Sequence, residues 1–506
     1  MNTASPSLHG KPVRTQTLCL SVQTMMPLLL SGLLAGCAAG PDFKRPAPPN
    51  ATSYTATPMP AQTASAAAAL GNAQTFQMHA MVDAAWWRSL GSSRLDALIE
   101  QALHSSPTLA AAKASLRQAQ ELHSAQAGST LYPQIDAGMG AQRQRTSPSA
   151  SGLSGSAREF ALYNASVGVH YRLDLSGGNR RALEALAARA DHRSHELAGA
   201  HLTLAANIAT TAITRAKLAG QIASTQAILE AQDEQINIAR HRVRLGQSSP
   251  DELLALQAQV EQTRAGLPLL RKQLEQNEHL LATLSGQAPG AAKVPDFTLE
   301  EFKLPATLPV TLPSELARRR PDILAAEALV HAANAEYGVA VAKLYPQLTL
   351  SASLGSQALT AGTLFGGGSA VWNMLGQLVQ PLFNPGLPAE KRASLAALDA
   401  AAANYQEVVL NALRNVADAL RALDHDAQAL DSLAIANSAA QSSLQSVERQ
   451  YTLGAAIYTQ LLVARQQMQQ NKTGLIAAQA QRLADTIALY QALGGGYEVN
   501  DKTGPV

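Results

Sequence analysis

The feature that most constrains the fold is an internal duplication, because the 506-residue chain repeats its own plan at a period of about 210 residues. Order and spacing hold along the whole length, so coincidence does not explain the matches. Two copies of this length predict a pseudo-symmetric duplication rather than a solenoid. The matched segments are Ser106-Pro107-Thr108-Leu109 with Arg320-Pro321-Asp322-Ile323, Leu131-Tyr132-Pro133-Gln134 with Leu344-Tyr345-Pro346-Gln347, and Arg244-Leu245-Gly246 with Thr452-Leu453-Gly454.

Each repeat predicts the same order of elements: a helix, two strands and a long helical hairpin. Tyr-Pro ends the first helix of each repeat and begins an extended run. The first repeat, 81–300, has a helix over about 94–127, strands near 134–143 and 161–175, and a hairpin over 180–286. The second repeat, 301–496, has a helix over about 314–343, strands near 347–356 and 371–382, and a hairpin over 390–493.

The strands alternate apolar and polar residues. Tyr163, Val167 and Tyr171 fall on one face of the second strand and Asn164 and His170 on the other. This pattern is typical of a transmembrane β-strand, although a half-exposed strand of a soluble sheet also shows it. The fourth strand alternates poorly and contains Pro381, so it is assigned by repeat symmetry. Four strands cannot close a barrel in lipid, which predicts a barrel shared between chains, with twelve strands in a cyclic trimer.

The helical segments over about 180–245 and 390–453 are far longer than a globular domain needs. At 1.5 Å per residue each would extend about 100 Å. Each turns at a glycine, Gly246 or Gly454, and a returning helix follows over about 250–284 or 458–493. Such hairpins require lateral neighbours, as in a coiled coil or a ring of helices. The expected fold class is therefore an α+β membrane protein.

A lipoprotein processing site, Leu34-Ala35-Gly36-Cys37, follows a short apolar run. The run is too short to span a bilayer, so residues 1–36 are expected to be a signal peptide and Cys37 the lipidated N-terminus. Residues 37–80 read as a Pro/Ala-rich tether and 497–506 as a C-terminal tail. Ala38 follows the cysteine where aspartate would favour retention in the inner membrane, so the outer membrane is expected.

Composition and motifs argue against several classes of function. A formal charge of +2 with 15% charged residues argues against nucleic acid as a partner. The sequence has no Gly-rich phosphate loop, nucleophile elbow or HExxH motif, so no enzyme, metal site or cofactor is expected beyond the covalent lipid on Cys37. His192 and His195, one turn apart, are expected to lie on a solvated helix face.

Taken together, these motifs resemble the TolC-type outer membrane factors, in the lipoprotein branch of OprM-like and NodT-like efflux proteins. The resemblance covers nearly the whole mature chain. It rests on Cys37 with Gly40-Pro41-Asp42-Phe43, on Trp86-Trp87, on Asp174-Leu175-Ser176-Gly177-Gly178-Asn179-Arg180-Arg181, on Arg318-Arg319-Arg320-Pro321-Asp322, on Pro381-Leu382-Phe383, and on Ala492-Leu493-Gly494-Gly495-Gly496.

The resemblance implies a homotrimer whose twelve-strand barrel in the outer membrane continues as an α-helical barrel through the periplasm. The implied function is passive export of drugs or other small solutes, as in multidrug resistance. The implied partners are a periplasmic membrane-fusion adaptor protein, an inner-membrane efflux pump of the RND type, and outer-membrane lipid.

The resemblance also places the periplasmic tip at Gly246 and Gly454. Glu252 falls where relatives carry an aperture acid, with Gln460 as its second-repeat counterpart. Val463 falls where relatives usually carry an aspartate, so this chain lacks the acidic pair of the second repeat. Asp251 and Glu252 therefore predict a carboxylate ring under three-fold symmetry, although acids after Pro250 also suit a helix N-terminus.

Three further sets of residues in the helical hairpins have roles that the sequence alone leaves open. Arg242 and Arg244 predict an adaptor-docking surface, or they favour a helix C-terminus. Tyr451 matches a tip tyrosine of the family, with a packing role as the alternative. Gly266, Pro268 and Gly474 interrupt the returning helices, and we hypothesise that these helices kink there when the duct opens.

Two alternative functions remain at the level of sequence. One is an outer-membrane duct of type I protein secretion, against which the lipoprotein site favours the efflux branch. The other is a lipid-anchored periplasmic coiled-coil scaffold without a pore, against which the alternating strands argue.

Overall fold

A computed structural model describes residues 39–147, 154 and 156–496 of the chain. The predicted signal peptide, the predicted lipidation residue Cys37 and the predicted tail 497–506 lie outside the described residues. Within the described part, two compact units are present. Unit 1 combines the described residues up to Phe43 with 121–187 and 331–399, and unit 2 combines 44–120, 188–330 and the described residues from 400 onward. Each unit therefore takes segments from both sequence repeats.

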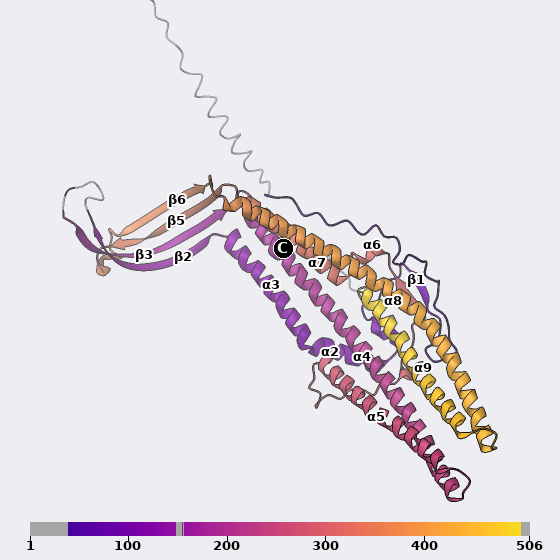
Figure 1. Cartoon of the computed structure of the whole chain (residues 1–506). Helices are drawn as coiled ribbons and strands as arrows, with labels where there is room; N and C mark the ends of the chain where they lie inside the picture. Colours follow the sequence, from indigo (N-terminus) through magenta and orange to yellow (C-terminus); the bar gives the residue numbers. More distant parts are fainter. Residues whose placement is uncertain (1–38, 148–153, 155, 497–506) are drawn as a thin grey trace, which may run out of the picture. The chain divides into compact units, whose positions relative to one another are not determined.

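Unit 1 is built on a four-stranded antiparallel sheet of order β2-β3-β5-β6 (Figure 1). The central pair, β3 with β5, joins the first repeat to the second, so the duplicated hairpins form one sheet. The outer edges of β2 and β6 have no strand partner within the described part of the chain. The strand bounds are β2 Gln134–Thr146, β3 Arg158–Leu173, β5 Gln347–Ala358 and β6 Ala370–Val379.

The register of the sheet gives it two chemically different faces, because directly paired residues share a face. Ile135 pairs with Val169, which pairs with Ala352, and Ala352 pairs with Met374. The neighbouring positions pair Asp136 with Gly168 and Ser353 with Asn373 on the other face. One face is thus largely apolar, with charged residues at one end at Arg143, Arg145 and Glu159, and the other is mostly polar or small, with apolar exceptions at Phe160, Leu162, Val371, Leu375 and Val379.

The fourth strand is shorter than predicted. It ends at Val379, whereas the sequence interpretation extended it to residue 382 through Pro381. Proline cannot donate a ladder hydrogen bond, so the chain leaves the sheet before it. Beyond the strand, the Gln380 side chain donates instead to the Leu344 carbonyl at 3.1 Å.

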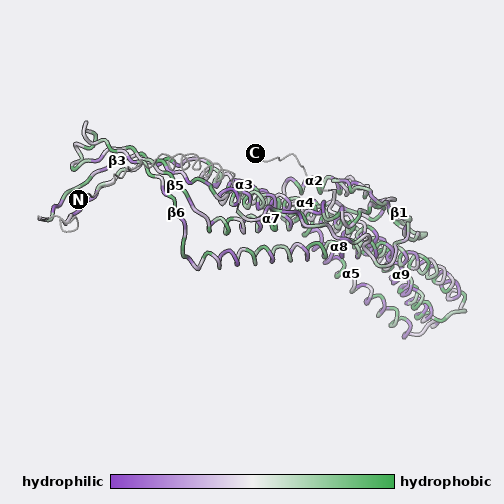
Figure 2. The backbone as a smooth tube through the Cα atoms, turned by 90° about the horizontal axis from the view of Figure 1, so that it is seen from above, coloured by the Kyte–Doolittle hydropathy of each residue, from purple (hydrophilic) through white to green (hydrophobic). Residues whose placement is uncertain are grey.

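The long helices are α4 Gly178–Arg244 and α8 Gly386–Thr452, each of 67 residues. The returning helices are α5 Pro250–Leu284 and α9 Tyr458–Ala492. These bounds match the predicted ones to within a few residues, because proline, serine and glycine mark the turns. Figure 2 shows hydrophobic and hydrophilic residues mixed along these helices.

No helix in the described part of the chain carries an apolar run long enough to cross a membrane.

The first helix of each repeat is broken, which corrects the single helices predicted there. The first is α2 Ser93–Ser105 followed by α3 Pro107–Leu131. The second is the short α6 Pro313–Leu316 followed by α7 Pro321–Ala342. A proline begins α3 and α7 because it lacks the N–H that a helix interior needs but is tolerated at the first helical position.

Unit 2 contains a second, two-stranded sheet that the sequence did not reveal. The strand β1 Thr75–Met78, within the predicted tether, pairs in parallel with β4 Thr307–Val310. Trp86 begins the short 3-10 helix η1 Trp86–Leu90 and packs against Tyr490 of α9 with ring centroids 5.5 Å apart. The C-terminal end of the predicted tether is therefore part of the folded body. A further 3-10 helix, η3 Leu299–Glu301, lies before β4, and η4 Ala361–Thr363 connects β5 and β6.

Candidate functional site

Both hairpin turns are closed by the same pattern of backbone hydrogen bonds. The Gly246 N–H donates to Val243 and the Gln247 N–H to Arg242, while the Gly454 N–H donates to Tyr451 and the Ala455 N–H to Gln450. This hydrogen-bond pattern defines a Schellman motif, whose glycine adopts a left-handed conformation. The observed φ angles are +70° at Gly246 and +74° at Gly454. The two glycines thus end α4 and α8 and allow the chain to reverse.

The two hairpins pack against each other near these turns. A buried apolar cluster joins Ile236 of α4 and Leu256 and Val260 of α5 to Tyr458 and Leu461 of α9. Leu444, Val447 and Tyr451 of α8 pack around it. The equivalent ends of the two repeats therefore form one apolar body, which we call the tip.

A depression of about 500 Å³, lined by both apolar and charged residues, lies beside this cluster. Tyr451 faces Tyr458 with ring centroids 5.9 Å apart, and the Arg242 guanidinium lies 5.4 Å from the Tyr451 ring. The Arg465 guanidinium donates to Glu448 at 3.0 Å. Burial lowers the pKa of Arg465 and raises the pKa of Tyr458. Among the described residues, the Tyr458 hydroxyl and Arg465 Nη1 have no hydrogen-bond partner.

The predicted tip acids lie in the first turn of α5. The Ser249 hydroxyl caps this helix by accepting from the Asp251 N–H at 3.1 Å, and the Ser248 hydroxyl donates to the Glu252 carboxylate. Asp251 is exposed and Glu252 is half-buried. Both acids therefore occupy the helix N-terminus that their position after Pro250 suggested. Their role in an aperture stays a prediction.

The second-repeat counterparts supply no charge to the equivalent turn. The Gln460 carboxamide accepts a hydrogen bond from the Ile457 N–H at 3.0 Å, which caps α9. Val463 is exposed over 66% of its surface. The first turn of α9 contains no acidic residue, in contrast with that of α5. Of the two returning helices, only α5 therefore supplies carboxylates in its first turn.

The predicted docking arginines differ in their surroundings. Arg242 is half-buried and lies over Tyr451 of the second repeat. Arg244 is exposed, and its guanidinium approaches the His241 ring at 2.8 Å. Arg242 therefore links the two repeats, while Arg244 extends the basic surface at the end of α4.

The predicted kink residues all lie inside continuous helices. Gly266 and Pro268 belong to α5, and Gly474 belongs to α9. A Cβ atom added at Gly266 would meet nothing within 4 Å, and one at Gly474 would meet Leu433 at an ordinary 3.6 Å. Close packing therefore does not require glycine at either position, and the kink hypothesis stays a prediction.

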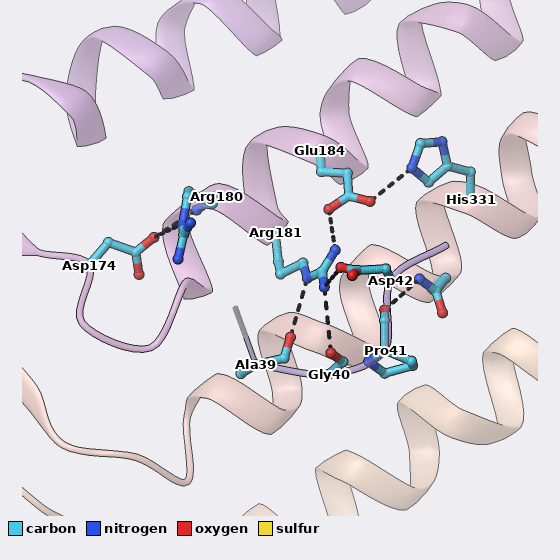
Figure 3. Close-up of polar contacts among 10 residues, drawn as sticks. Ala39, Gly40, Pro41, Asp42, Asp174, Arg180, Arg181, Glu184 and His331 are labelled. Carbon is cyan, nitrogen blue, oxygen red and sulfur yellow. Dashed lines mark hydrogen bonds and ion pairs between the residues drawn. The ribbon is translucent and has the colours of Figure 1, made fainter. Parts of the chain in front are cut away.

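A second site, which the sequence interpretation did not single out, holds the segment that follows Cys37 (Figure 3). The Arg181 side chain is 6% exposed and donates to the Ala39 carbonyl at 3.2 Å and to the Asp42 carboxylate at 2.6 Å. Arg181 Nη1 donates to the Glu184 carboxylate at 2.7 Å, and the Asn334 side chain donates to the Pro41 carbonyl at 3.0 Å. We call these residues of unit 1 the N-terminal clamp.

Shape as well as charge fixes this segment. Gly40 has a φ of +83°, and a Cβ atom there would lie 2.7 Å from the Gly338 Cα. Phe43 stacks on the His331 ring with centroids 4.3 Å apart, and His331 in turn contacts Glu184 at 2.8 Å. The sequence signals for the clamp were the motif Gly40-Pro41-Asp42-Phe43 and the motif that ends in Arg181, which contained both sides of the contact but did not show that they meet.

The two histidines predicted to lie on a solvated helix face do not do so. His192 Nδ1 lies 3.0 Å from the Ala325 carbonyl and its side chain is 16% exposed. His195 is half-buried, and burial lowers its pKa. The prediction failed because α7 packs over this part of α4. No cluster of potential metal ligands is present within the described residues.

The chain matches a known protein family over most of its length. Residues 98–287 and 312–495 match the family described as outer membrane efflux protein, in two segments that follow the two repeats. The chain is 31% identical over 428 residues to the pyoverdine export outer membrane protein OpmQ of Pseudomonas aeruginosa, covering 83% of this chain and 88% of that one. It is 29% identical to the probable efflux pump outer membrane protein TtgC of Pseudomonas putida, covering 92% and 94%.

Comparison with solved structures supports the same family assignment. The outer-membrane channel OprN superimposes with a TM-score of 0.81 at 26% identity, covering 91% of this chain and 99% of that one. The architecture is thus that of a trimeric outer-membrane β-barrel, with four strands from each chain, continued by a barrel of long helices. On its sequence and its fold, the chain belongs to the outer membrane efflux protein family.

Proposed function

We propose that three copies of this protein form the exit duct of a tripartite efflux system, which conducts small solutes passively across the outer membrane. A periplasmic membrane-fusion adaptor binds the helical tip, and an inner-membrane pump of the RND type supplies the solute. The observation that carries this proposal is the sheet of unit 1, which has one apolar face, one mostly polar face and two edges without strand partners. A sheet with open edges is unfavourable in lipid, so copies must close it into a barrel around water.

The tip supplies the proposed entrance to the duct. Asp251 is exposed and Glu252 half-buried in the first turn of α5, and three-fold symmetry would repeat both carboxylates around one opening. Such a ring attracts cations and repels anions where the opening is narrow. Arg242 and Tyr451 connect the two hairpins beside this turn, which makes the same region a candidate for adaptor docking.

The lipid anchor belongs to the same proposal. Cys37 carries the lipid, and the N-terminal clamp binds the chain from Ala39, only two residues later. The Ala39 N–H also donates to the Ser176 carbonyl at 2.8 Å, between β3 and α4. The clamp supports an anchor position at the junction of sheet and helices, which is the level of the inner leaflet of the outer membrane.

Single-channel recording in planar bilayers tests this function. The full-length trimer is compared with Asp251→Asn/Glu252→Gln and with the control Glu275→Gln, which removes an exposed charge of α5 about 35 Å from Glu252. We expect discrete openings of the wild type, a reduced preference for cations in the double variant, and unchanged selectivity in the control. A folded trimer without openings would support the scaffold alternative, and equal selectivity in all three proteins would exclude the acidic ring.

A further inference from the structure

The apolar face of the sheet ends in a pair of arginines. Along β2 this face carries Ile135, Ala137, Met139 and Ala141, and the next two positions on it are Arg143 and Arg145. The two guanidinium side chains are 81% and 69% exposed. Glu159, across the strand pair, lies 3.6 Å from Arg143 and 3.7 Å from Arg145. Two positive charges thus share one carboxylate, which leaves an excess of one positive charge.

The strand geometry places this pair at one boundary of the lipid. From Ile135 to Arg143 the strand rises about 27 Å, and a strand tilt of about 40° reduces this to about 20 Å along the barrel axis. The apolar band of such barrels is about 25 Å tall. Arg143 and Arg145 therefore lie at the edge of the band, where the cost of a lipid-facing arginine falls to about 0–1 kcal/mol.

Arg143 and Arg145 lie at the outer edge of this apolar band. The strand β2 begins three residues after α3 ends, so Ile135 lies at the helical end of the sheet and Arg145 at the end where residues 147–157 connect β2 to β3. In the proposed channel the helices occupy the periplasm. The arginine pair consequently faces the outer leaflet.

Barrel closure leaves this surface accessible. Copies of the chain pair through the edges of β2 and β6, whereas the side chains of Arg143 and Arg145 project from a face of the sheet. Arginine presents a planar fork of donors that matches phosphate oxygens in pairs. The apolar surface below the pair, with Met139 77% exposed, fits acyl chains.

We propose that Arg143 and Arg145 bind the phosphate groups of an anionic glycolipid in the outer leaflet, whose acyl chains lie along the apolar face of β2 and β3. Glu159 orients the two guanidinium groups and limits their affinity. This inference rests on the proposed orientation of the channel in the outer membrane. The lipid would hold the β2 edge where one copy of the chain meets the next.

Native mass spectrometry of the full-length trimer in detergent, titrated with bis-phosphorylated lipid A, tests the proposal. We expect Arg143→Gln/Arg145→Gln to weaken lipid binding about tenfold and Glu159→Gln to strengthen it. The control is Arg158→Gln, which removes an exposed arginine paired with Thr146 at the same end of the sheet but on its opposite face. The control should bind as the wild type does.

Three results would overturn the proposal. They are equal lipid binding by the wild type and the double variant, equal binding of the dephosphorylated lipid, and displacement of the lipid by inorganic phosphate at equal concentration. If the double variant does not assemble, an unchanged affinity in Glu159→Gln has the same consequence. Wild-type conductance is measured separately, so a failure of the channel function is distinguished from a failure of lipid binding.

Discussion

The residues that reverse the chain at the tip combine a left-handed backbone with open surroundings. At both Gly246 and Gly454 the φ angle is positive, yet an added Cβ atom would meet nothing within 4 Å. Replacement by alanine therefore costs only the left-handed conformation, about 1 kcal/mol for each chain. We expect Gly246→Ala and Gly454→Ala each to lower the melting temperature of the purified trimer, as measured by circular dichroism.

Gly266→Ala is the matched control for this prediction, because it makes the same chemical change within the helical part of α5. Alanine is favoured over glycine in a helix interior by about 1 kcal/mol, so this variant should be more stable than the wild type. Equal destabilisation by all three substitutions would show that the positive φ angles are not the cause.

The polar residues buried beneath β1 predict a pH dependence of stability. Burial raises the pKa of Asp485 to about 7, and neighbouring Asp426 acts in the same direction while Arg482 opposes it. In the unfolded chain this carboxyl ionises near pH 4. Between about pH 4 and 7 the folded protein binds the extra proton, so its stability falls as the pH rises through this range and levels off above it.

Asp485→Asn removes this titration, and the melting temperature of the variant should depend less on pH between 4.5 and 7. Above pH 7, where the wild type buries an ionised carboxylate, the variant should be the more stable protein. Asp418→Asn on the exposed side of α8 serves as the control and should retain the wild-type slope. Parallel curves for Asp485→Asn and the wild type would contradict the assignment.

At the scale of elements, the sequence predicted those with strong local signals and missed those held by distant contacts. Ser249 and Pro250 mark the start of α5, so its bounds, Pro250–Leu284, were predicted from the sequence alone. The pairing of β1 with β4 joins four-residue strands more than 200 residues apart. It is supported from α9, where Arg482 donates to Gln74 at 2.9 Å. No local sequence pattern predicts such a long-range contact.

The same reason explains which parts of the candidate sites were predictable. Glycine and proline identified the tip turns because backbone conformation is a local property. The clamp around Arg181 was missed because its ligands come from residues 39–42, Glu184 and Asn334, and only the fold brings these segments together. The break before Pro321 was missed although a local signal marks it, because Arg318-Arg319-Arg320 interrupt the apolar pattern and a proline disfavours helical conformation in the residue before it.

The clamp makes a prediction about residues 39–43. Arg181→Gln removes the donors to the Ala39 carbonyl and the Asp42 carboxylate. We expect hydrogen exchange of the amides in residues 39–43 to accelerate about tenfold, which corresponds to about 1.4 kcal/mol of local stability. Mass spectrometry of peptic fragments measures this exchange.

The neighbouring substitution Arg180→Gln controls for the loss of a positive charge, since the Arg180 side chain is 54% exposed and lies 4.0 Å from Asp174. Its exchange in residues 39–43 should match the wild type. If Arg181→Gln also leaves the exchange unchanged, the clamp does not hold the N-terminal segment in solution.

At the scale of the whole molecule, the two faces of one sheet must meet lipid and water at once. Leu354 and Ser353 are adjacent in β5 and point to opposite faces. Leu354 pairs with Val167 and Trp372, and Ser353 pairs with Gly168 and Asn373. Placing the same charge at each position therefore separates the two environments with no other change in sequence context.

Leu354→Arg puts a guanidinium into the apolar band, which costs about 2–4 kcal/mol near the middle of the bilayer. We expect this variant to fold into vesicles with a lower yield and to lose stability toward urea. Ser353→Arg places its charge on the water-facing side, so the trimer should form normally. The ion selectivity of its channel should shift toward anions. Urea titration and planar-bilayer recording of both variants decide the question. If Ser353→Arg blocked assembly and Leu354→Arg did not, the assignment of lipid and lumen to the two faces would be reversed.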